Sequence, residues 1–459
     1  MKPTFLCGIA LSCTLFSSFA SAAPAATPSE SPVDTLVLAT DDVYDCAELP
    51  RGSAAEWVAA TAGGLVIGRR VLTALDGLPD TRIESVRVEG ARLVVGTRRG
   101  NVQVSLPDLR VMPGAAPGVP LSPESVRFLG PALLRAEHRG ESRACFATDQ
   151  GLRVAKRLPG GGWSDPERVG TSLSLPSANV AALAESDDAL FIGTFDSGLF
   201  RRDKRGTLTP VDAKNPNINA LHWDAKRRNL WVGTARGLVL CEQGVQCKRM
   251  GDVAGVHAVA PLGGGLVAAG GEGELSIYEA DGTRKQSMLR KHGLPFRAVW
   301  ALAKSKDGVL YVGTTSGLYH APLARLLPTS TEKIAWKRAS MVGGDLPDDW
   351  VTALAVDGDA VHVGTYNGGV VRFKRSAGEL TREGAHPSLG YVNPAGITVL
   401  DGGEIAVATM SGLHVGNGAE TGTFRKVATV GEDVTGVVRG KDGIAWIATR
   451  RGVMGRRVM

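Results

Sequence analysis

A short pattern, Val-Gly-Thr followed by two variable residues and a glycine, recurs along this chain about every 43 residues. Nearly intact copies occupy 93–102, 190–200, 230–239, 310–319 and 361–371. Degenerate copies complete the series, and the threonine position then falls at residues 61, 97, 148, 194, 234, 270, 314, 365, 409 and 449. A repeat of this length is typical of a β-propeller blade. The sequence therefore predicts an all-β protein of about ten four-stranded antiparallel blades.

Each repeat also has the internal order expected of a blade. In residues 289–320, a turn with Gly-Leu-Pro precedes an alternating strand, and Asp307-Gly308 then gives a hairpin signal, because type I′ turns need positive φ. The apolar segment 309–314 follows, as expected of a strand with both faces packed. The 59 glycines lie between such segments, which fits a protein with many tight turns.

The two ends of the propeller region predict a closed ring. The final repeat holds three strand-like segments, and residues 34–40 supply an unassigned one, so we expect an N-terminal strand to complete the last blade. Closure of this kind removes free sheet edges. The regular spacing, with no linker near residue 252, favours one ring of nine or ten blades. Two five-bladed rings, or one or two irregular units, are the alternatives.

The N-terminal residues have the features of an export signal. Lys2 is followed by an apolar segment over 5–20 and an Ala-Ser-Ala site at 20–22, so we expect a signal peptide over 1–22. A lipoprotein processed at Cys13 is the alternative.

Residues 23–33 are rich in Ala, Pro and Ser and predict a disordered tether, which leaves 34–459 for the propeller. The 52 basic and 46 acidic residues are interspersed, which argues against nucleic-acid binding. No later segment is apolar enough to span a membrane. We therefore expect a bacterial protein that is periplasmic or secreted.

The repeat resembles the two-component regulator propeller repeat, which is found in sensor ectodomains of bacterial hybrid histidine kinases. Segments 289–320, 346–373 and 75–102 carry the resemblance best, through the order Gly-Leu-Pro, first strand, Gly, and a Val-Gly-Thr strand. The resemblance implies a propeller and an extracytoplasmic position. The sequence shows no kinase domain, so we expect a stand-alone exported propeller.

The cysteines predict one local disulfide. Cys241 and Cys247 face each other across a predicted hairpin with Gly244 at its turn, and an exported protein folds in an oxidising compartment. Cys46 and Cys145 fall in units two repeats apart, so we do not expect them to pair. No second Cys/His pair lies near either cysteine of the hairpin, and we expect no metal site.

Motifs of catalysis and cofactor binding are missing from the sequence. The histidines form no paired ligand motif, the glycine clusters lack the lysine of a phosphate loop, and there is no nucleophile elbow. The repeated threonines could ring a ligand, but a threonine at a strand end also bonds the turn that follows. We interpret them as structural, and we expect no cofactor and no catalytic residue.

The rim of the propeller is the predicted binding surface. In this fold, the loops between second and third strands and the loops between blades share one rim around the central channel. The alignment places on it the candidate ligand-binding residues Arg98, Arg99, Asp149, Phe195, Asp196, Arg236, Arg297, Trp300, Trp350, Tyr366, Asn367, Arg450 and Arg451. Arginines among aromatic residues suit a peptide, glycan or protein ligand. Ordinary loop residues are the plainer interpretation.

These observations favour a non-catalytic binding or scaffold module that recognises a protein or a cell-envelope polymer. One alternative is an extracellular propeller enzyme, a polysaccharide lyase or glycoside hydrolase. Such an enzyme needs two convergent carboxylates or a histidine-containing acid/base group. The other alternative is a periplasmic sensor module that docks onto a separate membrane receptor.

Overall fold

The computed structural model describes residues 35–112, 127–129, 131–139, 142–169, 174–251, 254–289, 295–327, 334–376, 378–419, 422–440 and 443–457. The predicted signal peptide, the tether and Cys13 lie outside these residues. Among the described residues, no helix is long and apolar enough to cross a membrane. The helical turns in the described part of the chain are the short 3₁₀ segments η1 (Ala74–Asp76), η3 (Leu323–Leu326), η4 (Pro387–Leu389) and η5 (Asp401–Gly403).

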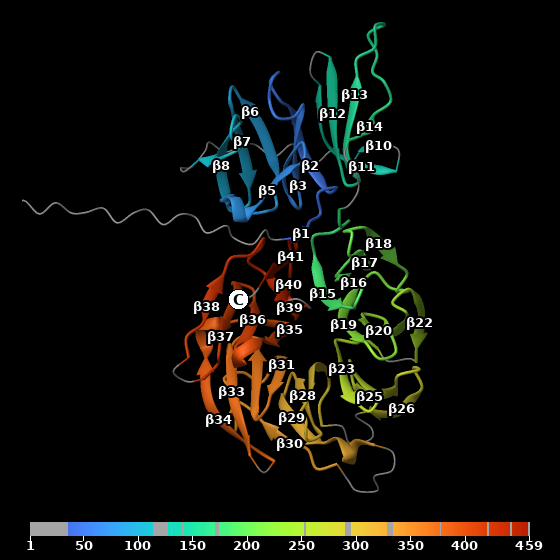
Figure 1. Cartoon of the computed structure of the whole chain (residues 1–459), viewed down its shortest axis with the longest axis vertical. Helices are drawn as coiled ribbons and strands as arrows, with labels where there is room; N and C mark the ends of the chain where they lie inside the picture. Colours follow the sequence, from blue (N-terminus) through green and yellow to red (C-terminus); the bar gives the residue numbers. More distant parts are fainter. Residues whose placement is uncertain are drawn as a thin grey trace, which may run out of the picture. The chain divides into compact units, whose positions relative to one another are not determined.

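Within the described residues, forty-one strands build ten antiparallel sheets, one for each repeat, and we number these sheets as blades 1 to 10 in chain order (Figure 1). Blade 1 comprises β2 (Val43–Glu48), β3 (Trp57–Thr61), β4 (Gly64–Ile67) and β5 (Arg70–Leu72). Blade 2 comprises β6 (Ser85–Glu89), β7 (Arg92–Thr97), β8 (Gly100–Ser105) and β9 (Val111–Met112). Blade 3 has a fifth strand and comprises β10 (Arg127–Leu129), β11 (Ala132–Arg139), β12 (Arg143–Thr148), β13 (Gly151–Lys156) and β14 (Glu167–Arg168).

The next four blades each have four strands. Blade 4 comprises β15 (Val180–Glu185), β16 (Ala189–Thr194), β17 (Leu199–Asp203) and β18 (Leu208–Val211). Blade 5 comprises β19 (Ile218–Asp224), β20 (Asn229–Thr234), β21 (Gly237–Glu242) and β22 (Gln246–Met250). Blade 6 comprises β23 (Ala258–Gly263), β24 (Leu266–Gly270), β25 (Glu274–Glu279) and β26 (Arg284–Leu289). Blade 7 comprises β27 (Val299–Lys304), β28 (Val309–Thr314), β29 (Gly317–Pro322) and β30 (Lys337–Ala339).

The last three blades complete the chain. Blade 8 comprises β31 (Val351–Asp357), β32 (Ala360–Thr365), β33 (Val370–Ser376) and β34 (Glu379–His386). Blade 9 comprises β35 (Val392–Val399), β36 (Ile405–Thr409), β37 (Gly412–Gly416) and β38 (Arg425–Val427). Blade 10 comprises β39 (Val434–Arg439), β40 (Ile444–Thr449), β41 (Gly452–Arg457) and the N-terminal β1 (Thr35–Val37). Strand β1 pairs antiparallel with β41, so the predicted closing strand is confirmed.

Seven of the ten blades form the closed ring. The first strands of blades 4 to 10 contact one another in chain order, and β39 contacts β15, which completes the circle. Figure 1 shows these blades, from β15 to β41, around a common centre. The ten blades were predicted correctly, but the expected ring of nine or ten blades is corrected to seven.

Blades 1, 2 and 3 form a separate group, the three-blade stack, in the order 3-1-2. Strand β2 contacts β11 and β12 on one side and β6 on the other. The side chains on the faces of blades 2 and 3 that point away from blade 1 explain why no further blade packs on either end of the stack. On blade 2 this face carries Arg87, Glu89, Arg92, Asn101 and Gln103, and on blade 3 a row runs through Glu137, Phe146, Arg153 and Arg168. The charged face of blade 2 suits a terminal repeat, which must face water, and on blade 3 Phe146 is buried in an apolar cluster formed within the blade itself.

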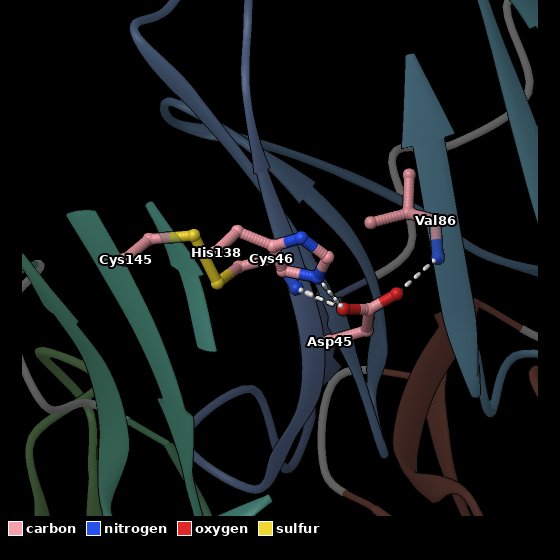
Figure 2. Close-up of a disulfide and its surroundings, with 5 residues drawn as sticks. All are labelled: Asp45, Cys46, Val86, His138 and Cys145. Carbon is pink, nitrogen blue, oxygen red and sulfur yellow. Dashed lines mark hydrogen bonds and ion pairs between the residues drawn. A yellow bond between two sulfur atoms is a disulfide. The ribbon is translucent and has the colours of Figure 1, made fainter. Parts of the chain in front are cut away.

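The order 3-1-2 also corrects the expectation for Cys46 and Cys145, which form a disulfide with a Cα–Cα distance of 6.4 Å. The two cysteines lie on neighbouring blades because blade 3 packs directly on blade 1. Beside the bridge, Asp45 Oδ1 lies 2.8 Å from His138 Nε2, and Asp45 Oδ2 accepts a hydrogen bond from Val86 N at 2.9 Å (Figure 2). Asp45 of blade 1 is therefore bonded to blade 3 and to blade 2.

A second contact joins the same three blades. The Tyr44 ring lies under two guanidinium groups, 4.4 Å from Arg82 and 4.2 Å from Arg135. Asp42 accepts a hydrogen bond from the Tyr44 hydroxyl at 2.9 Å and pairs with Arg135 at 2.7 Å.

The glycine that precedes the threonine in the repeated pattern is required by the packing between blades. A Cβ atom on it would lie 2.9 Å or less from the β-branched residue that leads into the next blade. The pairs are Gly193 and Ile218, Gly233 and Val256, Gly313 and Val351, and Gly364 and Val392; in blade 6, Gly270, which the sequence alignment put at the threonine position, makes the same close approach to Val299. The small residue therefore makes room for the neighbouring first strand.

The threonine of the pattern holds the turn that follows it. Its hydroxyl donates to the carbonyl of the glycine that ends the turn, at 2.6–3.1 Å. This bond forms at Thr61, Thr97, Thr148, Thr194, Thr234, Thr314, Thr365, Thr409 and Thr449. The structural interpretation of the threonines is confirmed.

Candidate functional site

The rim of the seven-bladed ring contains a cavity of about 530 Å³. Six of the seven blades contribute to its wall, and small residues such as Ala181 and Gly255 fill the spaces between larger ones. The aromatic, polar and charged residues of the wall are Phe195, Asn219, His257, Glu272, Trp300, Asn393, Thr435 and Arg450.

A narrower space of about 170 Å³ continues from this cavity between the first strands. Both spaces share Asn219, His257 and Trp300 in their walls, so the larger cavity is the mouth of the central channel. The channel wall below is mostly apolar and includes Leu183 and Val259. The polar side chains are therefore concentrated at the mouth.

Arg450 and Phe195 form one side of the mouth. The Arg450 guanidinium lies 5.7 Å from the centroid of the Phe195 ring, and 48% of Phe195 is exposed. Arg450 Nε donates to Asp433 at 3.0 Å, and Arg450 Nη1 donates to Asn179. The charge of this arginine is thus already balanced within the protein.

A continuous row of aromatic side chains, which we call the aromatic row, runs from the cavity across blades 6 to 9. His257 stacks on Trp300 with 4.3 Å between ring centroids, and Trp300 meets Trp350 at 5.4 Å. Trp350 stacks on Tyr366 at 4.2 Å, and Tyr366 meets Tyr391 edge-on at 4.3 Å. These five residues come together because each lies in or beside the terminal residues of a strand at the same rim.

His257 and Glu272 bring an imidazole and a carboxylate to the cavity. His257 Nε2 lies 3.8 Å from Glu272 Oε1. Burial lowers the pKa of His257, and the nearby carboxylate opposes this effect without cancelling it. The imidazole is therefore neutral near pH 7.

The structure gathers five of the predicted rim residues at this site. Phe195, Trp300 and Arg450 line the cavity, and Trp350 and Tyr366 continue the aromatic row. Three further candidates, Asp196, Arg236 and Arg297, lie exposed in loops of the ring. Asn367 is exposed beside Tyr366, and its backbone N donates to Asp348 at 2.8 Å.

The other candidates belong elsewhere. Arg98 and Asp149 lie in the three-blade stack, where Arg98 pairs with Glu84 at 2.6 Å and Asp149 accepts a hydrogen bond from Leu133 N.

Arg99 and Arg451 connect the stack with the ring. Arg99, on blade 2, pairs with Glu432, which leads into blade 10. Arg451, on blade 10, donates to Asp80 at 2.9 Å. Their guanidinium groups already have acidic partners, which the sequence alone could not reveal.

Sequence reasoning missed His257, Glu272, Asn219 and Asn393. The sequence could have indicated Glu272, because it is one of the two variable residues that follow Gly270, the aligned threonine position of the sixth repeat. Blade 6 has glycine where the other blades have threonine, which obscured the alignment there.

Comparison with known proteins agrees with the fold. Neither a protein-family model nor a curated protein matches the sequence. Among solved structures, the chain is similar to PorZ, an essential bacterial surface component of the type IX secretion system of Porphyromonas gingivalis, with a TM-score of 0.63 and 12% identity over 93% of this chain and 87% of that one. It is also similar to a streptogramin B lyase, with a TM-score of 0.50 and 14% identity over 61% of this chain and 94% of that one. These similarities show a β-propeller, and the two disulfides indicate an oxidising compartment outside the cytoplasm.

Proposed function

We propose that the protein is an exported, non-catalytic binding module that holds a protein or a cell-envelope polymer at the mouth of the seven-bladed ring. The cavity of about 530 Å³ carries this proposal. It has the size of a ligand site and combines aromatic walls with a few converging polar groups. The exposed Phe195 and the continuation of the aromatic row along the rim favour a ligand larger than the cavity itself.

The resemblance to the two-component regulator propeller repeat supports the extracytoplasmic position. It also favours a sensor role as a variant of the same proposal, in which the propeller binds its ligand and docks onto a separate membrane receptor. Both roles require the mouth of the ring to bind first.

Co-sedimentation of the purified protein with a bacterial envelope fraction tests the proposal. Phe195→Ala should weaken binding by about 10-fold, as expected for the loss of an aromatic contact at a site centre. Leu158→Ala is the matched control, because Leu158 is 47% exposed and lies in the three-blade stack. Equal binding by the two variants would exclude the mouth of the ring as the binding site.

One observation favours an enzyme as the second candidate. A neutral histidine beside a carboxylate can act as a general base, and His257 with Glu272 provides that pair at the cavity. Glu272 is the one carboxylate among the described residues that line the cavity, so the wall lacks the carboxylate pair of a glycoside hydrolase. Retention of binding by His257→Ala together with loss of turnover would establish catalysis.

A further inference from the structure

We propose that the ligand is an uncharged glycan chain that lies along the aromatic row and places one sugar unit in the cavity. This inference rests on the proposed function and names the ligand class for the same site. Three properties of the site lead to it: its aromatic surfaces, the direction of its hydrogen-bonding groups and its charge.

The aromatic row offers a rigid surface that extends beyond the cavity. Its members hold one another through stacked and edge-on contacts, so little conformational freedom is lost when a ligand binds. Tyr366 remains 38% exposed within the row. The face of an aromatic ring is electron-rich and attracts the polarised C–H groups on the flat side of a sugar ring.

The polar groups at the row and the cavity match hydroxyls, which both donate and accept hydrogen bonds. The indole nitrogens of Trp300 and Trp350 are buried donors without a hydrogen-bond partner among the described residues. Such groups are costly to leave unsatisfied. Neither nitrogen is open to solvent in this structure, so a ligand hydroxyl would bond them only together with a small shift of the indole rings.

Two carboxamides of the cavity wall have a fixed orientation. Asn219 Nδ2 donates to the carbonyl of Val256 at 3.0 Å, and Asn393 Nδ2 donates to the carbonyl of Val434 at 2.7 Å. Because a carbonyl can only accept, these bonds fix which end of each amide is nitrogen. No hydrogen bond from another described residue reaches the two amide oxygens, which leaves them as acceptors for ligand O–H groups.

The charge of the site argues against a charged polymer. In the cavity wall, Arg450 is neutralised by Asp433 and Glu272 adds one exposed carboxylate. The exposed Arg236 and Arg297 lie in loops outside the wall. A polyanion would need several free cations, since its binding depends on neutralising phosphates or other acids. An uncharged chain of hydroxyl-bearing rings fits the site better than an acidic or basic polymer.

The experiment measures co-sedimentation with a bacterial envelope fraction that is untreated, treated with protease, or treated with periodate, which cleaves vicinal diols. We expect binding to survive protease and to be lost after periodate. Binding that is lost after protease and survives periodate would overturn the glycan inference and leave the proposed function standing. Failure of the wild type to bind the untreated fraction would overturn both.

Variants then locate the ligand on the row. Tyr366→Ala should weaken binding to the protease-treated fraction by about 10-fold, whereas Tyr366→Phe, which keeps the ring, should bind within about 3-fold of the wild type. Leu158→Ala is the control, because Leu158 is 47% exposed and lies in the three-blade stack, away from the row. Wild-type binding by Tyr366→Ala, or an equal loss in Leu158→Ala, would refute the placement of the chain along the row.

Discussion

Removal of the Cys46–Cys145 disulfide should destabilise the three-blade stack more than removal of the Cys241–Cys247 disulfide destabilises the ring. The two bridges join residues that are 99 and 6 positions apart. In the chain-entropy model, a bridge restricts the unfolded chain more as the loop that it closes becomes longer. That relation gives about 4.7 kcal/mol for the long loop and about 2 kcal/mol for the short one at 25 °C.

Two double variants, C46A/C145A and C241A/C247A, allow a direct comparison with the wild type. Urea unfolding should be followed by hydrogen–deuterium exchange with mass spectrometry, because the stack and the ring can unfold in separate steps. We expect peptides from blades 1 and 3 to lose protection in C46A/C145A while peptides of the ring stay protected. In C241A/C247A the smaller loss should be confined to blade 5.

The same experiment tests the order of the blades. In a single ring of ten, blade 2 would separate blades 1 and 3, and this disulfide could not form between them. Non-reducing peptide mapping that finds Cys46 and Cys145 unbridged would refute the order 3-1-2. Equal losses of stability in the two double variants would refute the reasoning from loop length.

Two further predictions concern packing and pH. A Cβ atom on Gly313 would lie 2.7 Å from Val351 Cγ1, so Gly313→Ala should lower the free energy of unfolding by about 1–3 kcal/mol. The control is Gly436→Ala, where a Cβ atom would meet nothing within 4 Å and the free energy of unfolding should change by less than about 0.5 kcal/mol. Denaturant unfolding compares the two variants, and equal effects would contradict the packing role of the repeated glycine. The hydrogen bond to Asp45 raises the pKa of His138 above its usual value of 6.5, so its stabilising effect is complete below that value and is lost as pH rises through the folded-state pKa. The stability difference between the wild type and His138→Gln should therefore be largest near pH 6 and shrink toward alkaline pH, and a pH-independent difference would contradict it.

The blades could be predicted because the sequence pattern that identifies each blade depends on local interactions. The small residue and the threonine of the repeat serve packing and turn formation within a few residues, so nine of the ten blades carry the threonine whatever their neighbours are. Ring size depends instead on which blade faces are apolar. The segment 85–89 alternates Ser-Val-Arg-Val-Glu, with Arg87 and Glu89 on the face that points to water, and this alternation was the available signal that blade 2 ends a stack.

The candidate site could be predicted in part for the same reason. Repeat phase places Phe195, Trp300 and Arg450 on one rim, and the structure brings all three to the cavity. The position of a residue within its repeat cannot show which rim arginines form ion pairs with acidic residues of distant repeats. Arg451, for example, donates to Asp80, which is 371 residues away in the sequence. Local reasoning therefore could not foresee the acidic partner that Arg451 has in the folded protein.

The position of the repeated pattern limits which surfaces of this propeller are available to bind the proposed ligand. Its glycines and threonines are used for packing and turns, and the channel wall below the mouth is mostly apolar. The variable loops at the rim are then the segments free to differ between blades, and in blades 6 to 9 they carry the aromatic row from His257 to Tyr391. Because that row covers only part of the ring and Phe195 with Arg450 form another side of the mouth, the surface is asymmetric. An asymmetric mouth on a nearly symmetric ring can bind a chain in one direction, which seven equivalent loops could not specify.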